Sequence, residues 1–227
     1  MKLARRFEAL GINSAARRRL FTEYGASVLP LTKKGKAHFP PLWQRDATLK
    51  DLLEALSEGH CAYCQSPAGA DQDWPVEHFK PKTLFPTSAY DWKNFFISCG
   101  RCNRHKSNKW PKSGGYICPD KGDPSAAFQF HEDGRIEASK KFGNAQETID
   151  DFQLDRKGLR SKRALMISHF VAQARRAVRR WNGKNVPLQV RKELEQSLIV
   201  AELFPYSAAI NQCVRSVWNG AFPKAKM

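Results

Sequence analysis

The chain has 227 residues, of which 41% are hydrophobic and 11% aromatic, and its formal net charge is +16. This composition excludes a disordered chain and indicates a globular protein of one domain or one and a half. The positive charge favours a polyanionic partner, either nucleic acid or an acidic membrane surface, over a charge that serves only solubility.

Residues 1–45 are expected to form a helical lead-in followed by a loop. The opening MKLARRFEAL is basic but has no apolar run behind it, so we expect no signal peptide. No stretch of the chain is long and apolar enough to span a membrane, so we expect a cytoplasmic protein. Ser14 is placed to cap a helix over residues 15–24, and the proline-containing stretch 28–41 predicts an extended loop.

A clear helix is expected next, beginning at Thr48 and ending at Gly59. Thr48 and Asp51 resemble a capping box, and Cys61 follows the helix almost at once. One apolar face recurs at helical spacing and consists of Leu49, Leu52, Leu53 and Leu56.

The second half of the chain is expected to be a hairpin and a set of helices. After a turn-rich connector, residues 128–136 predict a hairpin with Asp133-Gly134 as its two-residue turn. The chain is expected to be helical from Ala145 onward, with the main helices over residues 159–181, 188–203 and 206–218.

Basic residues are concentrated at the start of this helical region. The span from Arg156 to Lys184 contains ten Lys or Arg and no Asp or Glu. A helix with this composition repels itself unless an anion lies nearby, so the span predicts a surface for nucleic acid or an acidic partner. The alternative is a solvated helix face. The basic residues are Arg156, Lys157, Arg160, Lys162, Arg163, Arg175, Arg176, Arg179, Arg180 and Lys184.

Four of the six cysteines are arranged as metal ligands. Thirty-four residues separate two C-x-x-C pairs, which are Cys61 with Cys64 and Cys99 with Cys102. Each pair places two thiolates close together, and two pairs complete a tetrahedral shell for Zn²⁺. With all four positions taken by protein, the predicted zinc site is closed and structural. Cys118 and Cys213 have no partner pattern.

Between and after the cysteine pairs lie three polar motifs that indicate nuclease chemistry. They are Val-Glu-His at residues 76–78, Asp-Trp-Lys-Asn at 91–94 and Cys-Asn-Arg-His-Lys at 102–106. Hydrolysis of a phosphodiester needs a base to deprotonate water and a cation at the phosphate. His78, whose ordinary pKa is near neutrality, suits the role of general base.

This order of motifs resembles the HNH endonuclease family, whose fold is the ββα-metal unit. The resemblance implies an α+β fold, with a zinc-stapled ββα-metal (HNH) core embedded in a mainly α-helical chain. We place the lead-in at 1–45, the nuclease core at 46–115, and the hairpin and basic helical region at 116–227.

The resemblance also implies the roles of the site residues. Glu77 alternates with His78 along the strand, so it reaches a metal only if the strand end twists, and the family's corresponding acid does so. Asn103 is the expected second ligand, and oxygen ligands favour Mg²⁺ or Mn²⁺. Asn94 matches the asparagine that braces the loop and orients the histidine. The expected nucleic-acid contacts are Lys80, Lys82, Arg101, Arg104 and Lys106.

A longer stretch, about residues 52–170, resembles the PtuB-type nucleases of Septu and some retron anti-phage operons. The sequence motifs that carry this resemblance are CAYC, EHFKPK, DWKN and SCGRCNR-x-K. It implies an ABC-type, PtuA-like ATPase as partner and, in retron versions, a reverse transcriptase with its msDNA. The chain has no Walker motif of its own, which is typical of a nuclease subunit regulated by another protein.

Other functions remain open at this point. One is an HNH nuclease of a restriction system or a mobile element. Another is a zinc-containing nucleic-acid-binding subunit that does not cut, although such a protein has no need of Glu77, His78, Asn94 and Asn103 together. In a third alternative, the main function of the C-terminal helices is to bind an acidic partner protein. For a nuclease, we expect DNA as the substrate more than RNA.

Overall fold

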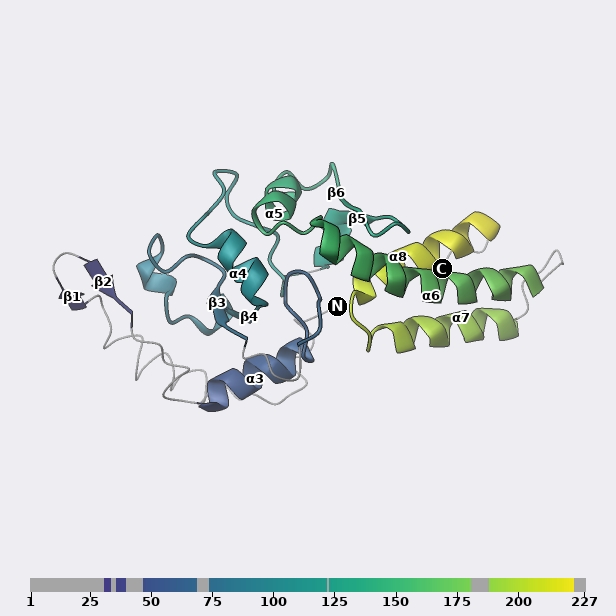
Figure 1. Ribbon diagram of the computed structural model, residues 1–227, viewed down its shortest axis with the longest axis horizontal. Helices are drawn as coiled ribbons and strands as arrows, with labels where there is room; N and C mark the ends of the chain where they lie inside the picture. The colour runs from purple at the N-terminus through teal and green to yellow at the C-terminus, as the bar shows by residue number, and fades with distance from the viewer. Residues whose placement is uncertain are drawn as a thin grey trace.

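The computed structural model describes residues 31–33, 36–39, 47–68, 74–121, 123–180 and 188–222. The helix predicted over residues 15–24 lies outside these ranges. Where an extended loop was expected, strand β1 (Leu31–Lys33) pairs antiparallel with β2 (Lys36–His38). Figure 1 shows this hairpin at one end of the molecule and three long helices at the other, with the cysteine-containing segment between them.

A two-stranded sheet and a short helix form the centre of the cysteine-containing segment. Strand β3 (Val76–His78) pairs antiparallel with β4 (Phe95–Ile97), with Glu77 opposite Phe96. Helix α4 (Gly100–Lys106) follows β4 directly. All six strand residues are buried, so these strands belong to the core. The connection between the strands contains the 3-10 turns η3 (Pro86–Ser88) and η4 (Trp92–Asn94).

Helix α3 (Ala47–Ser57) covers one side of this unit and contacts β4. It begins one residue before the predicted start, and Leu53 and Leu56 are buried at 3% and 2% exposure, as the apolar face predicted. The chain leaves the helix through Gly59, whose φ of +67° lies in the left-handed region that favours glycine. The next residues lead straight into the first cysteine pair.

The predicted hairpin after residue 128 is confirmed, with a longer turn. A 3-10 turn, η5 (Pro124–Ala127), leads into β5 (Phe128–Phe130), which pairs with β6 (Ile136–Ala138). Gly134 adopts a φ of +81° and donates to the His131 carbonyl at 2.9 Å, while the His131 amide donates to Arg135 at 3.0 Å. The turn therefore has three residues between this pair, with the glycine in the left-handed position.

Four helices follow among the described residues, and their predicted positions are confirmed to within a few residues. They are α5 (Ala145–Asp151), α6 (Lys157–Arg180), α7 (Leu188–Ala201) and α8 (Ser207–Ala221). The last three lie side by side and contact one another (Figure 1). None of the described helices combines the length and apolar character that a membrane span requires.

The basic residues of α6 are not one uniform surface. Arg163 is buried, and its guanidinium donates to the Gly134 carbonyl at 2.7 Å and to the Leu154 carbonyl at 2.9 Å. Arg160 pairs with Asp155 at 2.8 Å, and Arg175 pairs with Glu132 at 2.7 Å. The expected anion surface is thus wrong for Arg163, because acceptors from other elements surround a side chain that the helix turns inward.

Candidate active site and cysteine cluster

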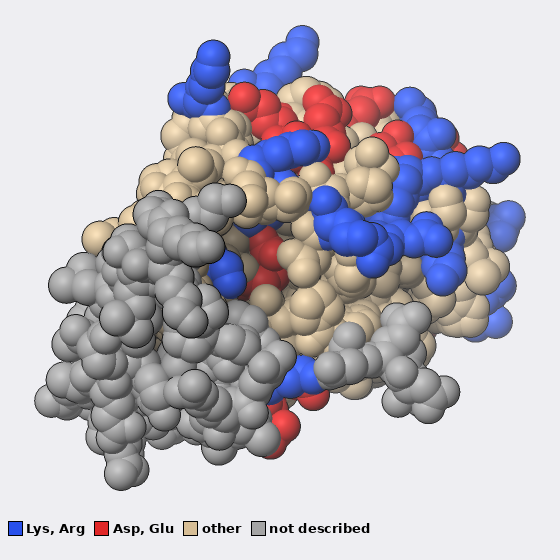
Figure 2. Space-filling model, turned by 60° about the vertical axis from the view of Figure 1, so that its left-hand side comes forward, with Lys and Arg blue, Asp and Glu red and all other residues tan. Residues whose placement is uncertain are grey.

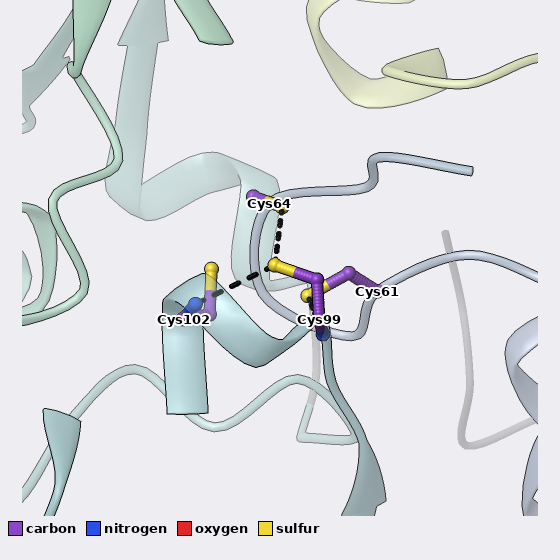
Figure 3. A group of neighbouring side chains, drawn as sticks. All are labelled: Cys61, Cys64, Cys99 and Cys102. Atoms are coloured by element: carbon purple, nitrogen blue, oxygen red, sulfur yellow. Dashed lines mark hydrogen bonds between the residues drawn. The ribbon is translucent and has the colours of Figure 1, made fainter. Parts of the chain in front are cut away.

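The two C-x-x-C pairs meet in one cluster, as the spacing predicted. Cys61 and Cys64 lie on the loop after α3, Cys99 caps α4, and Cys102 lies in its first turn. Their Sγ atoms all lie within 4.8 Å of one another, and those of Cys64 and Cys99 are 3.8 Å apart. Figure 3 shows the four side chains pointing toward a common centre. Tetrahedral zinc bonded to sulfur at about 2.3 Å separates two sulfurs by about 3.8 Å, so the cluster has the spacing for this ion.

Hydrogen-bond donors contact several of these sulfurs, while burial raises the pKa of the Cys61 thiol. The Cys99 amide donates to the Cys61 Sγ at 3.3 Å, and the Cys102 amide donates to the Cys99 Sγ at 3.4 Å. Hydrogen bonding with Cys102 also lowers the pKa of Cys99 to about 7. The Arg156 guanidinium reaches Cys102 at 3.8 Å and Cys64 at 3.7 Å. A cation at this position offsets the negative charge of metal-bound thiolates.

At the other end of α4 lies a buried ion pair between Lys106 and Glu77. Lys106 is 1% exposed and Glu77 is 4% exposed. The Lys106 ammonium contacts the Glu77 carboxylate and also donates to the His78 carbonyl at 2.6 Å. Burial raises the pKa of Glu77, and the adjacent ammonium opposes that rise. Lys106, predicted as a phosphate contact, thus has a buried charge that is paired with a carboxylate.

His78 ends β3 with its ring held against a carbonyl group. Its Nε2 lies 2.9 Å from the Ala89 oxygen, and since a carbonyl only accepts, Nε2 carries the hydrogen. The neutral ring then has its lone pair on Nδ1. Burial lowers the pKa of His78 to about 4, with the Lys82 charge adding to the effect. The imidazole is therefore neutral at pH 7, which is the state that a general base requires.

Asn94 ties together the two segments that hold His78. Its side-chain oxygen accepts from the Lys80 amide at 2.7 Å, and its side-chain nitrogen donates to the carbonyls of Lys80 at 3.0 Å and Ser88 at 2.9 Å. Lys80 lies just beyond the end of β3, and Ser88 precedes Ala89, whose carbonyl accepts from His78. Asn94 thus braces the strand end against the turn that orients the imidazole.

A cavity of about 430 Å³ opens beside these groups. Glu77 and His78 both line it although they are consecutive, because β3 ends at His78 and alternation along the strand no longer separates them. Asn103, Lys82 and Arg104 line the same cavity. Figure 2 shows a hollow with acidic atoms inside it and a lysine or arginine side chain beside it. We call this cavity the acid–histidine cleft.

The other predicted contacts lie outside this cleft. Lys80 is exposed, with its ammonium 5.7 Å from the centre of the Phe85 ring, and Arg101 lines a different cavity. Sequence reasoning missed two contributors to these sites, the Ala89 carbonyl and the Arg156 guanidinium. Neither has a signal in the local sequence, because one is a backbone atom and the other contacts a cysteine 54 residues away.

Comparisons with known proteins agree with this geometry. Residues 61–109 match the family model described as HNH endonuclease. The chain is 30% identical over 156 residues to the Septu protein PtuB of Bacillus mycoides (strain KBAB4), covering 56% of this chain and 53% of that protein. It is 33% identical over 85 residues to the Septu protein PtuB of Bacillus thuringiensis, covering 37% of this chain and 33% of that protein.

The chain spans about half the length, or less, of these curated relatives. The matched segment contains both cysteine pairs, the acid–histidine cleft and all of α4. The predicted α+β class with an HNH core is confirmed by the match and the observed elements. Residues 61–109 are therefore similar to the HNH endonuclease family, and a longer part of the chain is similar to the Septu PtuB proteins.

Proposed function

We propose that this chain is a metal-dependent endonuclease that hydrolyses nucleic-acid phosphodiester bonds, with DNA preferred over RNA. The observation that carries the proposal is the acid–histidine cleft. It places a buried carboxylate, a neutral histidine and an amide side chain in one cavity of a segment that the HNH model matches. Lys82 and Arg104 at the same cavity supply positive charge for the phosphates.

In this proposal His78 is the general base. The bond from Nε2 to the Ala89 carbonyl directs the basic lone pair to Nδ1, and burial keeps the ring neutral. Nδ1 accepts the proton of the attacking water as the water oxygen bonds to phosphorus and the bond from phosphorus to the leaving sugar oxygen breaks. The leaving oxygen takes its proton from solvent water. Asn94 holds the ring in position for this step without touching the substrate.

Glu77 and Asn103 would hold the catalytic cation. One Glu77 oxygen pairs with Lys106, and the other has no hydrogen-bond partner among the described residues. That oxygen and the Asn103 amide oxygen are hard donors, and Mg²⁺ or Mn²⁺ is commonly held by one or two such groups together with substrate phosphates. The bound cation would stabilise negative charge at the phosphate. Lys106 fixes the carboxylate at the cleft wall.

The cysteine cluster would hold a structural zinc ion, since the sulfur spacing and the full set of protein ligands suit a closed site. The likeness to Septu PtuB proteins further supports a role in anti-phage defence in the cytoplasm beside an ABC-type, PtuA-like ATPase. A retron reverse transcriptase with its msDNA is a further candidate partner on the same family grounds.

Incubation of the full chain with supercoiled plasmid, and separately with tRNA, tests the activity in Mg²⁺ and in EDTA. His78→Ala is expected to lower the rate of plasmid cleavage about 10²–10⁴-fold, the usual contribution of a general base. His169→Ala, on the exposed face of α6, is the matched control and should cut at the parent rate. Cleavage that persists in EDTA, or a plasmid left intact even with the ATPase added, would overturn the proposal.

A further inference from the structure

A second and larger cavity lies beside the acid–histidine cleft, on the cysteine side of α4. It has a volume of about 750 Å³ and lies between the loop after the first cysteine pair, the start of α4 and the start of α6. Among the residues that the structure describes, four basic side chains and no acidic one line it. We call it the basic cavity, and its cationic residues are Arg101, Arg104, Arg156 and Lys162.

The geometry of α4 joins the two cavities. Cys102 and Lys106 are four residues apart, so both face inward and are buried. Arg101 and Arg104 are three residues apart on the opposite, exposed face. Arg104 lines both the cleft and the basic cavity. A chain of phosphates leaving the cleft past Arg104 therefore enters the basic cavity.

The charges at this cavity are available to a ligand. Within the described part of the chain, Arg101, Arg104 and Lys162 form no ion pair with an acidic residue. This separates them from Arg160 and Arg175 on α6, which are paired with carboxylates. Unpaired cations that face one cavity repel one another, and an anion that enters the cavity lowers this electrostatic free energy.

The first turn of α6 adds backbone donors to the same place. Gly158 lines the basic cavity, and a side chain at that position would meet open space. The amides of Lys157 and Gly158 have no acceptor within the described residues. They begin a helix of 24 residues, whose N-terminal end favours a negative group.

We propose that the basic cavity is a second phosphate site, which holds the backbone of the nucleic acid on the cysteine side of the cleft. The proposal rests on the endonuclease function above, because its occupant is the continuation of the strand in the cleft. Arg156 belongs to both the cysteine cluster and the basic cavity, because its guanidinium contacts the cysteine sulfurs and it also lines the cavity. The cysteine cluster then helps to form the substrate path as well as the fold.

The test measures binding without cleavage, in the full-length His78→Ala chain. Arg101→Glu with Lys162→Glu is compared with Lys140→Glu and Lys141→Glu, two exposed lysines at which the same change of charge is made. Fluorescence anisotropy follows a labelled DNA duplex over a range of KCl concentrations. We expect the first pair to weaken binding at least about tenfold and to lower the salt slope by about 0.9 per lost phosphate contact, while the control pair keeps the parent slope.

Equal affinity and equal salt slope in both pairs would overturn the proposal. It would also be overturned if Arg101→Glu with Lys162→Glu lost binding to poly-glutamate but kept the parent affinity for DNA, because the occupant would then be an acidic protein. Failure of the endonuclease function looks different. In that case the His78-intact chain leaves plasmid uncut, whereas the anisotropy result still decides whether the basic cavity binds DNA.

Discussion

The two ends of α4 are held in different ways. At its start, Cys99 and Cys102 meet two cysteines from a separate loop, so the four sulfurs form a cluster that could hold a metal ion. At its end, Lys106 is held by Glu77 and the His78 carbonyl, which the chain itself supplies. One helix of seven residues thus connects a cysteine cluster suited to a metal ion with an ion pair and a hydrogen bond that the chain makes by itself.

This difference indicates how each half of the segment that matches the HNH model, residues 61–109 (the HNH unit), should lose its structure. If the cluster holds a metal ion, its loss leaves four closely spaced cysteines without the bond that joins the two cysteine pairs, and we expect the whole unit to loosen. Loss of one polar partner at the other end leaves a single buried group unsatisfied, with a defined local cost. The following variants separate the two cases, from the largest expected effect to the smallest.

Cys102→Ser is expected to abolish the folded HNH unit. Structural zinc contributes folding energy outright, so a lost ligand removes both the ion and much of the secondary structure around it. The measurements are zinc content and thermal melting by circular dichroism. Cys118→Ser is the control, because its thiol lies outside the cluster and contacts Asp120 instead. A Cys102→Ser chain with normal zinc content and melting temperature would disprove the dependence.

Lys106→Met should destabilise the chain by about 3–5 kcal/mol, because it leaves the Glu77 carboxylate buried without a counter-charge. Urea denaturation measures this free energy of unfolding. Lys109→Met, which breaks an exposed pair with Asp151, should cost less than about 1 kcal/mol. Adding Glu77→Gln to Lys106→Met should restore part of the loss. No recovery in the double variant would show that the charge pair is not the cause.

Asn94→Ala should cost about 1–3 kcal/mol, because it leaves half-buried backbone groups of Lys80 and Ser88 without their side-chain partner. It should also lower kcat for DNA cleavage while the Kd for DNA is unchanged, since the side chain acts through the orientation of His78. Lys93→Ala, at the exposed neighbouring position, serves as the comparison. An equal fall in kcat in both variants would contradict the proposal that Asn94 orients His78.

Arg156→Ala should weaken zinc binding about 10–100-fold, the usual effect of removing a group that supports metal ligands. Competition with a coloured chelator measures the affinity. The melting temperature in excess zinc should stay close to that of the parent, unlike that of Cys102→Ser. Lys157→Ala, one residue further on and exposed, should keep the parent affinity. If Arg156→Ala matches that control, the guanidinium does not support the cluster.

Short-range patterns predicted the elements that contact one another locally. The C-x-x-C pairs predicted the cysteine cluster, and the three polar motifs predicted the residues of the acid–histidine cleft. Both are short patterns, because a tight loop or one helical turn fixes the spacing between the residues within each of them. The pairing of Lys106 with Glu77 was not predicted, because the two residues are 29 positions apart in the sequence. Arg163 was misassigned for a similar reason, since its acceptors belong to the hairpin turn and to the residues before α6.

The β1–β2 hairpin was missed because prolines at both ends of the stretch favour extended backbone and conceal the pairing between them. The three-residue turn before β6 likewise shows that a local pattern does not predict how the strands pair. Asp-Gly is a strong signal for a turn, but the hydrogen bond between His131 and Arg135 decides its length.

The contacts of α8 with the first cysteine loop have a consequence for the order of folding during synthesis. The Tyr206 hydroxyl lies 3.3 Å from the Ser66 hydroxyl, and the Ala208 amide donates to the Gln65 side chain at 3.4 Å. These partners are about 140 residues apart in the chain. The ribosome therefore releases the cysteine loop and the whole HNH segment long before their last covering element. Such distant pairings form slowly, so a newly made chain completes the surroundings of its first cysteine pair only late in folding.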